Sequence, residues 1–263
     1  RHIPAWKQMD IAESLMNTKP DSALMVLESI SPSDVKGKET SARYALLKSM
    51  ALDKNCIDTT TFNVLQPAID YYIEHGSPDE QLRTYYYKGR IYQNQGNNDL
   101  AMQSFMRGKE FCQEASDTLT MANLMVAQAT IQYRIYKIDD FIKNNLEAAN
   151  LYSSIGRTDY ELLSLANALD GGILNNDKSL SDSVWNIAKQ RVSENPDLGS
   201  IIVPYELSYA LKFGNKEDVI GILNHRESVD SINDMVKLNV AEAYYKIGDV
   251  RNAKRVLDAI PIK

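Results

Sequence analysis

The sequence predicts an all-α protein built from helical hairpins in series, and three observations support this prediction. Small and aromatic residues recur at the spacings that two packed antiparallel helices need, most clearly between residues 89 and 105. Most of the 12 glycines and eight prolines stand where predicted helices start or stop. No run of alternating β-branched residues is long enough to indicate a sheet.

The clearest hairpin is predicted around residues 79–115. Gly89 and Tyr92 are three residues apart and share one helix face, and Ala101 and Phe105, four apart, share a face of the next helix. The small residues let the two backbones approach, and the rings fill the remaining volume. Gly96 can end the first helix in the left-handed conformation, and the three polar residues after it supply turn and N-cap chemistry.

The same pattern returns at both ends of the chain. In the last unit it is carried by Ala241, Tyr244, Gly248, Ala253 and Leu257. The first unit parallels the last, with one residue fewer in the turn, through Ala12, Ala23, Leu27 and Ile30. Gly248 follows Gly214 by 34 residues, and the unit between them fits more loosely.

The middle of the chain keeps the pattern with a longer period. Five residues align on Tyr92, Gly96, Ala101, Phe105 and Gly108 with an offset of 41, and they are Tyr133, Lys137, Ile142, Leu146 and Ala149. This offset predicts helices that are longer by a turn or two. Asp170-Gly171-Gly172 and a predicted long turn over 175–179 depart from the pattern. The register therefore stays open at 159–192, and also at 42–72.

Several helix starts and stops are predicted from local residues. Ser77-Pro78-Asp79-Glu80 has the form of a capping box, with a proline at the first helical position. Ser179-Leu180-Ser181-Asp182 is a weaker version of the same box. Pro67 and Pro204 should begin or kink helices, and Asn195-Pro196-Asp197 predicts a connector.

This arrangement resembles the tetratricopeptide repeat, a helix-turn-helix unit of about 34 residues with small, aromatic, small and aromatic residues in that order. With Gly89 at the eighth position, Tyr92, Ala101 and Phe105 fall at the eleventh, twentieth and twenty-fourth positions. The resemblance implies an α-solenoid, a right-handed superhelix of about six to seven hairpins, in a single domain over residues 1–263. The predicted repeats span 4–32, 39–76, 79–115, 117–154, 157–193, 198–226 and 231–263.

Composition and motifs argue against several classes of function. The formal net charge of −6 disfavours a binder of nucleic-acid phosphates, and no apolar run is long enough for a membrane span. Cys56 and Cys112 have no metal-type spacing, and no catalytic or nucleotide-binding motif is present. We therefore predict a protein that is not an enzyme and has no cofactor or metal. A hydrolase or transferase on a helical toroid would need a convergent cluster of acids.

The resemblance also implies which residues face a ligand, because the first helix of each tetratricopeptide hairpin lines the concave groove. The implied set is Arg83, Tyr86, Tyr87, Arg90, Gln93 and Asn94, followed by Arg134 and by Glu242, Tyr245 and Lys246. Guanidinium and amide groups can hold a carboxylate or the backbone of an extended peptide. The predicted partner is thus a protein or peptide, including one with acidic groups. The alternative is that Arg90 and Arg134 pair with acids on neighbouring helices and that the tyrosines pack between repeats.

Two functions follow, a protein-binding scaffold or the sensory or oligomerising region of a larger regulatory protein. Residues 20–30 and 42–47 resemble the opening of membrane-attached tetratricopeptide proteins of certain Gram-negative bacteria. That resemblance implies a membrane-anchored, extracytoplasmic location, and a cytoplasmic one stays open. The chain stops at Lys263 directly after a predicted complete repeat, with no polar capping helix. We therefore expect it to be part of a longer protein.

Overall fold

A computed structural model describes residues 3–224 and 234–261, and in these residues every element of regular structure is a helix. The all-α prediction is confirmed. The chain divides into two compact units, residues 1–131 and 132–263, and each is described by itself. Helix α7 (Thr118–Arg134) runs across this division. The predicted repeat boundaries at 226, 231 and 263 lie outside the described residues.

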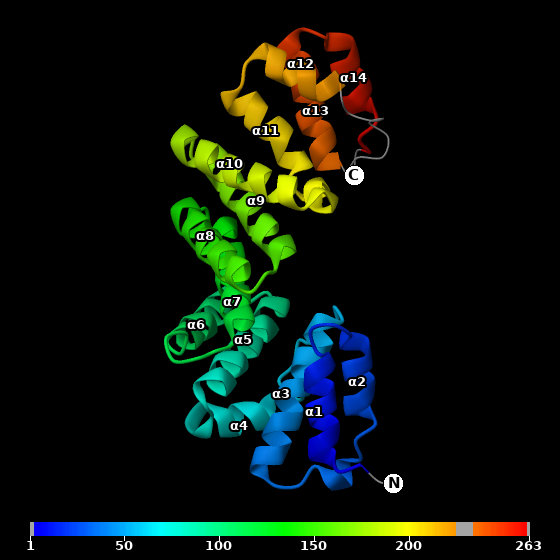
Figure 1. Cartoon of the computed structure of the whole chain (residues 1–263), viewed down its shortest axis with the longest axis vertical. Coiled ribbons are helices and arrows are strands. Elements are labelled where there is room, and N and C mark those ends of the chain that lie inside the picture. Colours follow the sequence, from blue (N-terminus) through cyan, green and yellow to red (C-terminus); the bar gives the residue numbers. More distant parts are fainter. Residues whose placement is uncertain (1–2, 225–233, 262–263) are drawn as a thin grey trace. The chain divides into compact units, whose positions relative to one another are not determined.

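In unit 1, helices that follow one another in the chain pack together (Figure 1). The first helices of successive hairpins also touch, α1 with α3 and α3 with α5. The elements are α1 (Ala5–Leu15), α2 (Pro20–Glu28), η1 (Pro32–Asp34), α3 (Lys38–Lys54), α4 (Gln66–His75), α5 (Pro78–Asn94), α6 (Asn98–Lys109) and the first part of α7.

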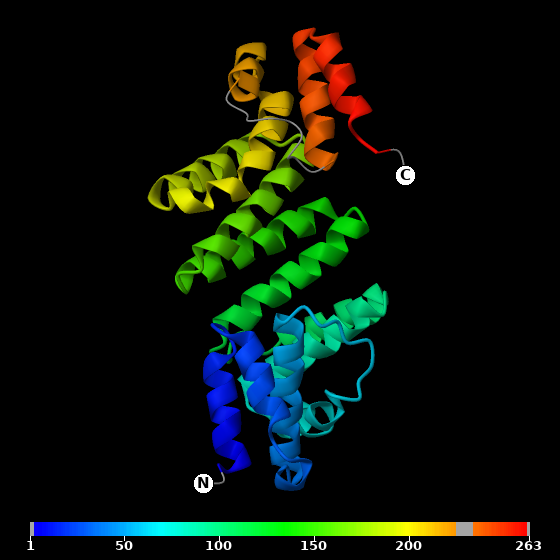
Figure 2. The same cartoon turned by 90° about the vertical axis from the view of Figure 1, so that its right-hand side faces the viewer.

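Unit 2 has the same kind of packing. Consecutive helices contact one another, and α11 also contacts both α9 and α13. Helices α13 and α14 lie side by side in Figure 2. The elements are α8 (Ile138–Ser154), α9 (Thr158–Leu174), α10 (Lys178–Glu194), η2 (Pro196–Ile201), α11 (Val203–Phe213), α12 (Lys216–Asn224), α13 (Asp234–Ile247) and α14 (Val250–Asp258).

The helix starts are set by local side chains. Ser77 forms the predicted capping box with Glu80, and Asn97 accepts from the backbone N–H of Leu100 at 3.2 Å. Pro67 and Pro204 lie in the first turns of α4 and α11, as predicted. The Ser179 box is wrong. Asp177 caps α10 instead, because its carboxylate accepts from the Leu180 N–H at 3.0 Å and the helix begins one residue later.

Six of the described helices end in one type of turn. After α5, the N–H of Asn97 donates to the Tyr92 carbonyl and that of Gly96 donates to Gln93, each at 2.9 Å. This is the Schellman arrangement, in which the residue after the helix is left-handed. The left-handed residues at the equivalent places are Cys56, Gly96, Tyr136, Gly156, Asn176 and Gly248, with φ between 56° and 89°.

These turns correct the predicted register in the middle of the chain. Tyr136 is the counterpart of Gly96, so the offset is 40 and not 41. Helices α7 to α10 each have 17 residues and begin at 118, 138, 158 and 178, which gives a period of 40 residues per two helices. The sequence misplaced this turn because Tyr136 is not a glycine, although the backbone there is left-handed.

The departure predicted at Asp170-Gly171-Gly172 is also wrong. Helix α9 continues through both glycines, and the turn after it covers only residues 175–177. A Cβ atom on Gly171 would lie 2.5 Å from the Cγ1 of Ile142, and one on Gly172 would lie 2.6 Å from the Oγ of Ser181. The two glycines therefore allow close packing against α8 and α10 and do not break the helix.

The predicted pairing of small and large residues holds in the α5–α6 hairpin. Ala101 and Phe105 are fully buried, and the ring of Phe105 lies directly over Gly89. In unit 2 the equivalent packing forms two clusters. One surrounds Trp185 between α9 and α10, and the other joins Leu207, Val219 and Val256.

Candidate functional site

The two predicted arginines of unit 1 are ion-paired with other helices. The Nε of Arg83 donates to Asp117 at 2.5 Å and its Nη1 to Glu13 at 3.2 Å. The Nε of Arg90 donates to Asp53 at 3.1 Å. Burial lowers the pKa of both guanidiniums, but the neighbouring acids and, for Arg90, the Tyr86 hydroxyl more than offset this, so both pKa values are raised.

The other predicted residues of α5 are also engaged in packing. Tyr86 and Tyr87 are 6% and 4% exposed. The side-chain amides of Gln93 and Asn94 donate to the backbone carbonyls of Ala127 at 3.2 Å and Thr59 at 3.1 Å. Arg90 thus pairs with an acid on a neighbouring helix, and both tyrosines are buried, as the predicted alternative to ligand binding has it. A binding role for this set stays a prediction, and a ligand would have to replace these contacts.

The space beside Arg90 and Asn94 is small. A cavity of about 10 Å³ lies there, between α3 and α5. That volume suits about one water molecule. A peptide would not fit without movement of the helices.

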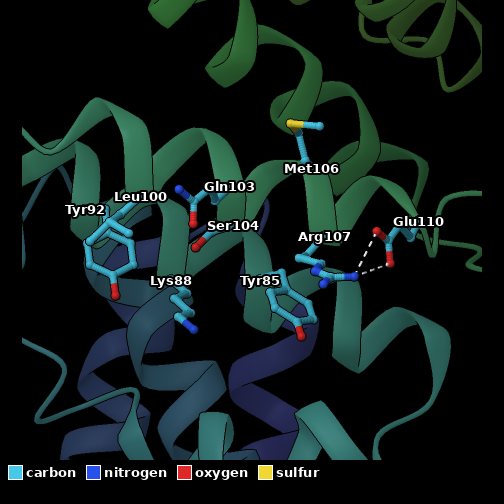
Figure 3. Close-up of a pocket in the computed structure, with 9 residues that line it drawn as sticks. All are labelled: Tyr85, Lys88, Tyr92, Leu100, Gln103, Ser104, Met106, Arg107 and Glu110. Carbon is cyan, nitrogen blue, oxygen red and sulfur yellow. Dashed lines mark hydrogen bonds and ion pairs between the residues drawn. The ribbon is translucent and has the colours of Figure 1, made fainter.

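A larger groove lies on another face of the α5–α6 hairpin (Figure 3). Its volume is about 600 Å³, and its lining residues are Tyr85, Lys88, Tyr92, Leu100, Gln103, Ser104, Met106, Arg107 and Glu110. The Nη1 of Arg107 donates to both carboxylate oxygens of Glu110, at 3.2 and 3.3 Å. The ring of Tyr85 stacks on Phe111, and that of Tyr92 has an edge contact with Phe62. Arg107 and Glu110 pair with each other, and the third charged lining group, Lys88, lies with its ammonium 6.0 Å from the centre of the Tyr85 ring.

Unit 2 has a groove of about 540 Å³ lined by the first helices α9, α11 and α13 and by residues just before α11. We call it the first-helix groove. Its lining residues are Leu163, Asp170, Ile173, Ile201, Pro204, Tyr205, Ser208, Leu211, Lys212, Asn239 and Glu242.

Residues of three first helices, α9, α11 and α13, meet in this groove. Ser208 and Glu242 each stand six residues before the glycine that directly follows their helix, Gly214 or Gly248, and Asp170 stands six residues before Asn176, the second residue after α9. The Nδ2 of Asn239 donates to the Oγ of Ser208 at 2.8 Å, which links α13 to α11. The groove is therefore built from a repeated position of the helices.

Asp170 is a half-buried carboxylate in the first-helix groove. Burial raises its pKa, and a hydrogen bond from the Tyr133 hydroxyl only partly opposes this. Tyr205, whose own pKa is raised by burial and by Asp170, lies nearby on α11. Within the described part of the chain, no lysine or arginine forms an ion pair with Asp170.

Replacing Asp170 by asparagine is expected to stabilise the protein at neutral pH. The folded-state pKa is above its ordinary value, so the folded state binds the proton more tightly and loses stability as the pH rises through that pKa. An amide keeps the shape without the buried charge, so its advantage should shrink as the pH falls through the raised pKa and should be lost below the ordinary aspartate pKa. Thermal unfolding followed by circular dichroism at several pH values would measure this.

Asp182→Asn provides a control of opposite sign. Lys178 and the Tyr209 hydroxyl, which both donate to this carboxylate, lower its pKa. Its removal should therefore destabilise the protein at neutral pH, and the loss should disappear in acid. Equal behaviour of the two variants would contradict the assignment of Asp170 as an unfavourably buried carboxylate.

The remaining predicted residues lie in or near unit 2's first helices. Glu242 lines the first-helix groove, and the Tyr245 side chain is 70% exposed on α13. The Nζ of Lys246 donates to the Leu211 carbonyl, and Arg134 is exposed at the end of α7. Asp170 was not predicted as a site residue because its neighbouring glycines predicted a turn.

A metal site and a membrane-spanning helix are both absent from the described residues. No group of three or more His, Cys, Asp and Glu side chains in residues 3–224 and 234–261 is placed to hold a metal ion. No helix in the same ranges is long and apolar enough to span a membrane.

Comparison with protein-family models, with curated proteins and with solved structures found no match to this chain. The basis for a function is therefore the lining and the chemistry of the two grooves.

Proposed function

We propose that the chain is a non-catalytic binding module of tetratricopeptide-like hairpins and that it holds an extended peptide segment of a partner protein in the first-helix groove. The observation that carries this proposal is that residues six positions before Asn176, Gly214 and Gly248 line one groove from three first helices, α9, α11 and α13. A groove built on a repeated position offers regularly spaced contacts. An extended chain has regularly spaced side chains that can meet them.

The walls of the groove combine the two kinds of contact that a peptide needs. Leu163, Ile173 and Leu211 supply apolar surface. Ser208 and Asn239 supply hydroxyl and amide groups that can pair with a peptide backbone. The α5–α6 groove of unit 1 lacks this register across several helices, and the predicted arginines of α5 are already paired.

The proposal is tested by selecting peptides and then blocking the groove. A random peptide library displayed on phage would be selected against the whole chain, and the enriched peptides would be measured by fluorescence polarisation. Leu163 is 48% exposed and lines the groove. Leu163→Glu places a charge on an apolar wall, so it should weaken the enriched peptides about tenfold or more.

Leu257→Glu is the matched control. Leu257 is 49% exposed but lies on α14, outside the groove lining, so its replacement should leave the affinities unchanged. Circular dichroism would verify that both variants are folded. Failure to enrich any peptide, or an equal loss in both variants, would reject the groove as the binding site.

A further inference from the structure

We propose that the first-helix groove selects peptides with a lysine or arginine next to an apolar residue, and that Asp170 and Glu242 receive the basic group. This inference rests on the proposed function and adds the chemistry of the ligand. It differs from the acidic partner that the arginines of α5 predicted.

The arginines of α5 already have acid partners, whereas the acids of the first-helix groove have no basic partner among the described residues. In unit 1, Arg83 and Arg90 already have acid partners at 2.5 to 3.2 Å, so an acidic ligand would meet neutralised cations. In unit 2, the buried acid Glu161 has Arg191 at 2.8 Å. Asp170 and Glu242 have no such partner among the described lysines and arginines.

The charged groups that line the first-helix groove are mainly acidic. Two carboxylates, Asp170 and Glu242, and one ammonium group, Lys212, are the charged lining groups. Lys212 is exposed and forms no ion pair with either carboxylate in the described structure. A ligand cation would therefore find a half-buried carboxylate that accepts from the Tyr133 hydroxyl but has no lysine or arginine partner among the described residues, and a charge-assisted hydrogen bond is stronger there than at a fully solvated site.

Apolar side chains surround Asp170 in the groove. Leu163, Ile173 and Ile201 line the same groove as Asp170. Lysine and arginine side chains bury their methylene stems along apolar surface while the charged head reaches a polar group. The ring of Tyr205 also lines the groove, and an aromatic face attracts a cation. A basic side chain next to an apolar one matches this combination.

The cost of keeping Asp170 ionised supports the same conclusion. Burial raises its pKa, so without a ligand the carboxylate destabilises the fold at neutral pH. A bound cation would remove that penalty. Groups that cost stability and face a groove are typical of binding sites.

The test uses a set of fluorescein-labelled octapeptides that share two leucines and differ at one central position, which is lysine, arginine, glutamine or glutamate. Polarisation with the whole chain should give an affinity about tenfold higher for the lysine and arginine peptides than for the glutamine peptide. The glutamate peptide should bind most weakly. In the double variant Asp170→Asn, Glu242→Gln, the ratio of the affinities of the lysine and glutamine peptides should fall to about one.

The matched control removes two carboxylates elsewhere in unit 2. Glu217 on α12 and Asp258 on α14 are exposed and do not line the groove. The double variant Glu217→Gln, Asp258→Asn changes the net charge equally and should retain the preference. Loss of preference in this control as well would show general attraction to an acidic protein and would overturn the inference.

Failure of this inference can be told from failure of the proposed function. If all four peptides bind equally, or the glutamate peptide binds best, and Leu163→Glu still abolishes binding, the groove binds peptides but the proposed selectivity is wrong. If no peptide binds, or Leu163→Glu has no effect, both the groove and its selectivity are rejected.

Discussion

Replacing Gly89 by alanine should lower the free energy of unfolding by about 3 kcal/mol, although alanine is the better helix former. A Cβ atom at this position would lie 2.3 Å from the Cε1 and 2.6 Å from the Cδ1 of Phe105. Phe105 is fully buried, so its ring cannot turn away into solvent. Either the ring or the α5–α6 packing must shift, and chemical denaturation followed by the helical circular dichroism signal would measure the loss.

Gly221→Ala is the control for this prediction. Gly221 lies within α12, and an added Cβ there would have no heavy atom within 4 Å. The substitution should therefore stabilise the protein by about 0.5 to 1 kcal/mol through helix propensity alone.

Phe105→Leu should recover part of the loss when combined with Gly89→Ala, because a smaller side chain makes room for the methyl group. A stabilising Gly89→Ala would mean that the two helices are not packed as described.

Replacing Arg83 by alanine should cost about 3 kcal/mol, the second large effect that we expect. Its guanidinium contacts Asp117 on one side and Glu13 on the other, and the side chain of Asp117 is only 12% exposed. Removing the cation leaves a largely buried carboxylate without a charged partner, which is more costly than losing an exposed pair. Asp117 also accepts from the backbone N–H of Thr120 at 3.0 Å, so the start of α7 should loosen as well.

Arg107→Ala tests whether burial is the reason for this cost. Arg107 pairs with Glu110 within one helical turn, but the two side chains are 66% and 58% exposed. Such pairs contribute about 0 to 0.5 kcal/mol. Equal losses for Arg83→Ala and Arg107→Ala in denaturation experiments would contradict the argument from burial.

Local signals predicted many of the helix ends correctly. The capping box at Ser77 and the left-handed Gly96 were both predicted from residue type, because capping and left-handed turns depend on a few neighbouring atoms. Tyr136 and Asn176 adopt the same conformation without being glycines. Because these two residues are not glycines, the positions of glycines in the sequence do not predict their turns.

The site was harder to predict for a related reason. The family resemblance placed both Arg90 and Glu242 on the ligand-facing side of a helix. Arg90 meets Asp53 from another helix, whereas Glu242 lines an open groove with Asp170. Asp170 was not predicted because the two glycines that follow it, Gly171 and Gly172, predicted a turn. In the structure these glycines lie within α9 and allow α8 and α10 to pack close to it.

The sequence alone determines that this protein is helical. It also determines that small and aromatic residues pack against each other within the hairpins and that many helix ends follow local capping rules. Those properties depend on residues within about one or two helical turns of each other, so periodicity and spacing are enough to predict them. Which polar side chains remain available to a ligand was decided only by tertiary packing. Arg83 and Arg90 are neutralised by acids that lie 34 to 70 residues away in the chain, and Asp170 meets no such partner among the described residues. Whether a charge is paired depends on distances between helices that are remote in sequence, and those distances exist only once the chain has folded.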